Sequence, residues 1–161
     1  MVTHHPQIHA GDLLFYNTPG SFVDFVIRTK TWSNVAHVEG YIGYGRSVAS
    51  RNGLGVNEYD FRSEGLVAIL RPIQRFNSQQ AYDWFKTVQG QQYDWSGLLC
   101  FAFAEWQGSP RKMFCSEFMK RWYEAGGLRI LNPQWSADRT APADLLKSPV
   151  MNWVWAKWTQ A

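Results

Sequence analysis

Short apolar segments separated by turn residues fill much of the first half of this chain, and longer segments with helical spacing fill most of the second half. Strand side chains alternate between two faces, whereas helix side chains repeat about every 3.6 residues. The strand segments are residues 12–16, 36–42, 47–51 and 67–70, and the helix segments are residues 77–89, 95–106 and 115–125. Strands near the front and helices near the back predict an α+β fold in which an antiparallel sheet packs against helices.

Weaker signals complete this pattern. Residues 18–19, Thr-Pro, supply the cap and first turn of a helix over residues 21–29, and residues 140–142 look like another helix start. The last dozen residues alternate weakly, as a strand or an edge segment does. Residues 53–55 are predicted to form a turn before the strand at 67–70.

Length and composition indicate one folded unit. The chain has 161 residues, of which 45% are hydrophobic and 18% charged, and this is enough apolar surface for a single core. We expect residues 1–10 to be a flexible arm and residues 11–161 to be one catalytic domain. The net charge is +3 without a block of Lys or Arg, so the sequence gives little support to nucleic-acid binding.

Two features bear on where the chain is found. Residues 1–6 lack the basic-then-apolar pattern of a secretory signal, and no apolar run approaches the roughly 18 residues of a membrane span. We therefore expect a cytosolic protein with no integral membrane segment, or export by another route. The two cysteines, Cys100 and Cys115, are expected to be free thiols because the cytosol keeps thiols reduced.

Cys115 is the candidate nucleophile because it opens a predicted helix. The unpaired N–H groups and the positive end of the helix dipole stabilise a thiolate there. Cys100 lies inside the nearly all-apolar segment Leu98–Phe101, where a thiol is a small hydrophobe, so we interpret it as structural. The histidines of the expected arm, His4, His5 and His9, have no Cys or carboxylate at ligand spacing, so we predict neither a metal site nor a cofactor.

His37 is the candidate base. It shares one face of its predicted strand with Glu39, and a turn at residues 43–46 would place Ile42 opposite Ser47 and Glu39 opposite Ser50. A catalytic imidazole needs an acceptor that fixes its tautomer, and either Glu39 or Ser50 can serve. Further candidates, for contacts with substrate, are Tyr16, Tyr93 and Ser116.

The motifs that carry these residues occur in a particular order. They are Gly-Asp-Leu-Leu-Phe-Tyr at residues 11–16, Ala-His-Val-Glu-Gly-Tyr-Ile-Gly at 36–43, Gln-Tyr-Asp at 92–94, and Phe-Cys-Ser-Glu-Phe at 114–118 followed by Ala-Gly-Gly at 125–127. Over about residues 11–145 the chain resembles the circularly permuted NlpC-type papain-like superfamily, in the YiiX and YaeF branch. In unpermuted relatives the cysteine helix precedes the histidine strand, whereas here the histidine comes first.

This resemblance implies a sheet packed on a helix whose N-terminal cysteine faces a histidine, with a third polar residue behind it. Bacterial relatives often carry an acid on the strand after the histidine, and residues 47–50, Ser-Val-Ala-Ser, contain none. The third member is therefore Glu39 or Ser50.

The resulting expectation is a cysteine hydrolase of amide or ester bonds. Cys115 would attack the acyl carbon and His37 would take and return the proton. The resemblance implies peptide or acyl-amide substrates, such as peptidoglycan peptides or lipids. Two alternatives stay open: a lipid acyltransferase or thioesterase with the same Cys-His pair, which the Trp-rich C-terminus would suit, and a non-catalytic binding module on the same scaffold.

Overall fold

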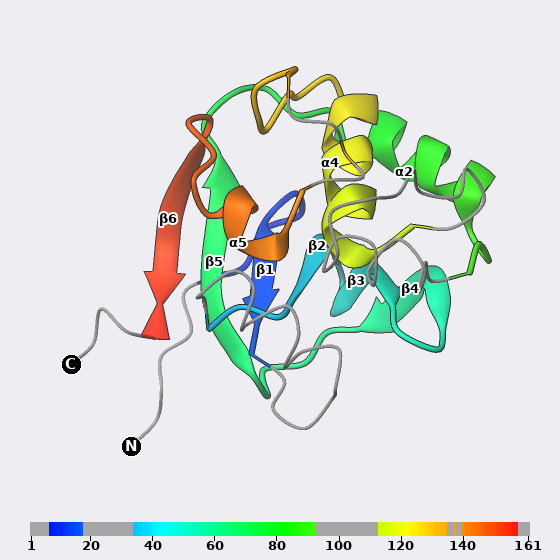
Figure 1. Cartoon of the computed structure of the whole chain (residues 1–161), viewed down its shortest axis with the longest axis horizontal. Helices are drawn as coiled ribbons and strands as arrows, with labels where there is room; N and C mark the ends of the chain where they lie inside the picture. Colours follow the sequence, from blue (N-terminus) through cyan, green and yellow to red (C-terminus); the bar gives the residue numbers. More distant parts are fainter. Residues whose placement is uncertain (1–6, 18–33, 93–112, 135–136, 138–139, 158–161) are drawn as a thin grey trace.

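A single antiparallel sheet organises the chain. The computed structural model describes residues 7–17, 34–92, 113–134, 137 and 140–157, and the predicted helices at 21–29 and 95–106 lie outside them. Within the described residues, six strands are ordered β4-β3-β2-β1-β5-β6, so that β4 and β6 form the two edges (Figure 1). The strands are β1 (Leu13–Tyr16), β2 (His37–Gly43), β3 (Arg46–Arg51), β4 (Gly55–Asp60), β5 (Leu66–Pro72) and β6 (Met151–Ala156).

Helices cover one face of this sheet (Figure 1). They are α2 (Ser78–Val88), α4 (Cys115–Ala125) and the short α5 (Pro142–Leu145). Helix α4 packs against β2 and β3 on one side and against α2 on the other. The expected α+β class, an antiparallel sheet packed against helices, is confirmed.

The helix boundaries follow from local chemistry. The side chain of Asn77 caps α2 by accepting a hydrogen bond from Gln80 N at 3.0 Å, so the helix begins where the sequence predicts. Helix α4 ends before Gly126 and Gly127, and Gly127 has the positive φ of 82° that favours glycine after a helix. Its buried stripe contains Phe118 and Trp122, so both ends and the buried face of α4 were predictable.

Strand β4 was not predicted beyond a turn at residues 53–55. Its sequence, Gly-Val-Asn-Glu-Tyr-Asp, is largely polar, and only its first two residues are buried. An edge strand with little apolar alternation gives a weak sequence signal, because its conformation comes from pairing with its neighbour. Here that neighbour is β3, which pairs with β4 along its full length.

The predicted register of the β2–β3 hairpin is wrong by one residue. Tyr41, not Ile42, pairs with Ser47, and an irregularity between Tyr41 and Gly43 absorbs the difference. The turn itself is tight because Tyr44 and Gly45 both have positive φ, 51° and 72°. A one-residue shift moves every side chain of the partner strand to the other face of the sheet.

The described part of the expected arm, residues 7–10, has contacts with the domain. His9 N donates to Asp12 Oδ2 at 2.8 Å, and Arg71 Nη2 donates to the carbonyl of Gln7 at 2.8 Å. Arg71 also forms an ion pair with the fully buried Asp12 at 2.7 Å. These bonds hold residues 7–10 against the sheet.

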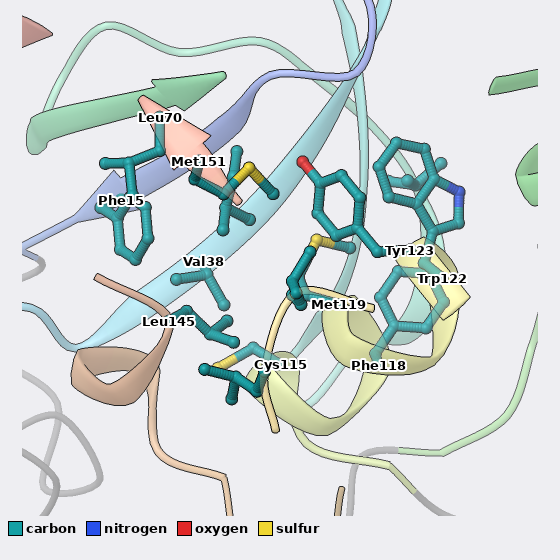
Figure 2. Close-up of a cluster of buried hydrophobic side chains, with 14 of the residues drawn as sticks. Phe15, Val38, Leu70, Cys115, Phe118, Met119, Trp122, Tyr123, Leu145 and Met151 are labelled. Carbon is teal, nitrogen blue, oxygen red and sulfur yellow. The ribbon is translucent and has the colours of Figure 1, made fainter. Parts of the chain in front are cut away.

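The main core lies between the sheet and α4, and Figure 2 shows its side chains converging from both layers. Trp122 of α4 lies directly against β2. A Cβ atom placed on Gly40 would lie 2.8 Å from the Trp122 ring, which is shorter than real Cβ contacts allow. Glycine at position 40 therefore lets α4 approach β2 closely.

We predict that Gly40→Ala lowers the free energy of unfolding by about 1–3 kcal/mol, because overpacking forces a rigid ring out of place. Urea denaturation would measure the loss. Trp122→Leu removes the obstructing ring, so its cost should be smaller in the Gly40→Ala background than in the wild type. Strict additivity of the two changes would contradict this explanation.

Candidate active site

Cys115 is the first residue of α4 and points into the region between that helix and the sheet. Figure 2 shows it close to Val38 and Leu145. No side chain caps the helix start at Phe114, and Cys115 is only 1% exposed. The N–H groups of a first helical turn have no partner within the helix, so the N–H of Cys115 is positioned to stabilise an oxyanion.

His37 opens β2 and lies within interaction range of the side chain of Cys115. Its Nε2 donates to Glu39 Oε1 at 3.0 Å, which leaves Nδ1 for the sulfur. Burial lowers the pKa of His37, but its interactions with Cys115 and Glu39 outweigh this effect and raise the pKa to about 9. The imidazole is therefore positively charged at neutral pH.

Glu39 is fully buried and is held on several sides. Ser47 Oγ donates to Oε2 at 2.5 Å, and Arg51 donates through Nε to Oε1 at 2.9 Å. Arg62 Nη2 lies further away, 3.7 Å from Oε1. Burial raises the pKa of Glu39, but the hydrogen bond and charge of His37, with Arg51 and Ser47, lower it to about 2, so the carboxylate stays ionised.

Of the two candidates for the third residue, Glu39 bonds to the imidazole of His37 and Ser50 bonds elsewhere. The one-residue change of register turns Ser50 to the helix side of the sheet, where its hydroxyl donates to the carbonyl of Met113 at 2.5 Å. Met113 lies two residues before Cys115. Ser50 therefore anchors the segment leading into α4 instead of contacting the imidazole.

Tyr16 and Ser116, which the sequence suggests as substrate contacts, are both buried and do not face a cleft. Tyr16 is fully buried and donates through its hydroxyl to the carbonyl of Arg62 at 3.1 Å, with its ring centroid 6.2 Å from that of His37. Ser116 is also fully buried and donates to the carbonyl of Thr140 at 2.5 Å. Both hydroxyls serve the fold, and Tyr93 lies outside the described residues, as does Cys100.

Three residues of the site were missed from the sequence: Ser47, Arg51 and Arg62. The first two lie on the Glu39 face of β3 once the register is shifted, and alternation along Ser47–Arg51 would have found them with the correct turn. Arg62 follows β4, the strand that was not predicted. Its guanidinium lies over the Tyr16 ring, 4.8 Å from the ring centroid.

The described residues form neither a metal centre nor a helix that could span a membrane. They contain no group of three or more His, Cys, Asp or Glu side chains arranged to hold a metal ion. The oxygens of Glu39 are already occupied by Ser47, Arg51 and His37, so the site does not fit one. In this part of the chain, none of the helices has the length and apolarity needed to cross a membrane.

The fold is similar to that of a solved bacterial protein. The metalloprotein YiiX from Escherichia coli O157:H7, a DUF1105 protein, superposes with a TM-score of 0.67 over 92% of this chain and 97% of its own. The chain has the YiiX fold. Sequence identity is 17%, so the similarity to YiiX concerns the fold alone. No protein-family model and no curated protein matches the sequence.

We predict that Glu39→Gln lowers the pKa of His37, because the variant keeps the shape of the side chain and removes the charge. Alkylation of Cys115 by iodoacetamide at neutral pH should slow by roughly tenfold, the equivalent of one pKa unit. NMR titration of the imidazole would measure the shift directly.

The matched control is Ser50→Ala, which removes a hydroxyl that bonds to Met113 and not to His37. This variant should leave the pKa of the His37 imidazole unchanged. A larger shift in Ser50→Ala than in Glu39→Gln would return the orienting role to Ser50.

The raised pKa of His37 also predicts how stability depends on pH. Folding raises this pKa from 6.5 to about 9, so its contribution to stability is fully present below pH 6.5 and lost as pH rises through about 9. Across this window the free energy of unfolding of the wild type should fall relative to that of His37→Gln. Urea denaturation at a series of pH values checks this, and parallel curves for the two proteins would contradict it.

Proposed function

We propose that the chain is a cysteine hydrolase that cleaves amide or ester bonds. The observation that carries the proposal is the buried series Cys115, His37 and Glu39, in which a helix-start thiol interacts with an imidazole that is hydrogen-bonded in turn to an ionised carboxylate. A nucleophile, a base and a group that orients the base are what acyl transfer by a thiol requires.

Each residue has a distinct role in the proposed reaction. The thiolate of Cys115 attacks the acyl carbon, and the N–H at the start of α4 stabilises the oxyanion that forms. His37 donates its proton to the leaving amine or alcohol, and it then takes a proton from the water that releases the acyl group. Glu39 holds the imidazole through Nε2, so that Nδ1 stays directed at the sulfur.

The permuted NlpC-type papain-like superfamily is the family proposed for this chain. The similarity to the YiiX fold supports it, as does the order of the site, in which the histidine strand precedes the cysteine helix. Peptidoglycan peptides and related acyl amides are the substrates proposed on this basis, for an enzyme that acts in the cytosol or after export by another route.

One observation favours a second candidate, a non-catalytic binding module. Cys115 is 1% exposed and His37 9%, and a buried free cysteine often serves only as a small hydrophobe. A lipid acyltransferase or thioesterase would use the same Cys-His pair and differ in the acceptor of the acyl group. Reactivity of the thiol and the fate of the acyl group separate these functions.

We predict that Cys115 reacts with iodoacetamide far faster than Cys100 in the folded protein, because Cys115 lies at a helix start beside an imidazole, whereas the sequence around Cys100 is that of an apolar segment. Peptide mapping after brief labelling measures both rates. His37→Gln should slow the labelling of Cys115 and leave that of Cys100 as it is. Equal labelling, or faster labelling of Cys100, would contradict the assignment of the nucleophile.

An activated acyl ester then distinguishes hydrolysis from transfer. Mass spectrometry should find the acyl group on Cys115, and the adduct should decay in water alone. Decay that needs an added alcohol or amine acceptor would indicate an acyltransferase, and no adduct on a folded protein would indicate the binding module. Cys115→Ser is the control for labelling at other residues.

A further inference from the structure

A hollow of about 470 Å3 lies beside the site, where β1 ends and β5 begins. The backbone bond from Asn17 N to the carbonyl of Gly65, 2.7 Å long, joins the two segments there. The buried side chains of Leu66 and Val67 give the hollow an apolar wall, and the charged residues around it are Arg62, Glu64 and Lys157.

Arg62 connects this hollow with the proposed catalytic residues. Its guanidinium lies over the ring of Tyr16, and that ring lies next to His37, with centroids 6.2 Å apart. Arg62 also approaches Glu39 at 3.7 Å. A group bound to Arg62 from the hollow would therefore be linked to His37 through Arg62 and through Tyr16 or Glu39.

The positive charge of Arg62 is not fully compensated. Glu39 contacts Arg51 at 2.8 Å and His37 at 3.0 Å, and both of these cations are closer to the carboxylate than Arg62 is. One carboxylate, Glu39, therefore faces three cations, and the charge of Arg62 is the least compensated of them. The lining of the hollow itself contains two cations, Arg62 and Lys157, and one carboxylate, Glu64.

Arg62 also has bonding capacity to spare. Its Nε is buried and has no hydrogen-bond partner among the described residues, while 37% of its side chain is exposed. A buried donor without a partner is costly, and a guanidinium binds carboxylates and phosphates through paired N–H groups. An anionic group in the hollow would balance the charge and bond to the exposed N–H groups of the guanidinium.

We propose that this hollow is a subsite for an anionic group of the substrate, with Arg62 as its main ligand and Lys157 as a second cation. The subsite rests on the proposed function, and it narrows the substrates to acyl compounds that carry a carboxylate or phosphate near the bond that is cleaved. The apolar wall of Leu66 and Val67 accommodates the carbon chain between that group and the acyl carbon.

Two matched probes test the subsite on the full-length protein. One is an iodoacetamide whose nitrogen carries a short alkyl chain ending in a carboxylate, and the other is the methyl ester of the same compound. The ratio of their labelling rates at Cys115 isolates the effect of the charge. We expect the wild type to react about five- to tenfold faster with the carboxylate probe than with the methyl ester. A charge-assisted hydrogen bond to a partly exposed guanidinium accounts for a difference of this size.

Arg62→Gln should reduce this ratio to near one, and Lys157→Gln should reduce it in part. Lys157 is exposed and lies outside the network of Glu39, so its variant tests the subsite even if Arg62→Gln disturbs the fold. Arg129→Gln, an exposed arginine that lines a different hollow, is the control for loss of a positive charge and should keep the wild-type ratio.

The outcomes are separable. A ratio near one in the wild type, or an unchanged wild-type ratio in both Arg62→Gln and Lys157→Gln, overturns the subsite. If the methyl ester still labels Cys115 in that case, the hydrolase proposal stands. Failure of both probes to label Cys115 overturns the proposed function and the subsite with it. Stronger protection by inorganic phosphate than by acetate at equal concentration would assign the anionic group as a phosphate, and the reverse as a carboxylate.

Discussion

The carboxylate of Glu39 is the group on which the arrangement of the site depends. It has no exposed surface, and a buried charge is tolerated only where opposite charges and hydrogen bonds replace water. Those partners come from three parts of the chain: His37 on the same strand, Ser47 and Arg51 on the next, and Arg62 after β4. The pairing of β2, β3 and β4 is what brings them together.

This dependence explains why the imidazole can hold a proton in a buried position. Burial alone would make His37 neutral, and the opposing effect of Glu39 and Cys115 decides its state. His37 itself, with Arg51 and Ser47, keeps Glu39 ionised, so that it remains an acceptor for the ring. Arg51 in turn stacks on Tyr59, 3.9 Å from the ring centroid, which extends the support of the site to the edge strand β4.

Much of the fold and part of the site could be predicted from the sequence. Cys115 and His37 were identified because a helix start and an alternating strand are local patterns. The choice between Glu39 and Ser50 could not be made, because it depends on a register that the irregularity after Tyr41 shifts by one residue. Strand β4 and Arg62 escaped prediction because a polar edge strand acquires its conformation from its partner.

The order of the elements along the chain has a consequence for biosynthesis. Tyr16, His37, Glu39, Arg51 and Arg62 are all translated before α4, and they lie on, or directly after, strands that pair with one another. Because chains emerge from the ribosome N-terminus first, His37 and its charged neighbours can assemble while Cys115 is still unmade. Cys115 is then the last of these groups to arrive, and a nascent chain has no thiol beside His37 until the strands that carry the histidine and its partners are present.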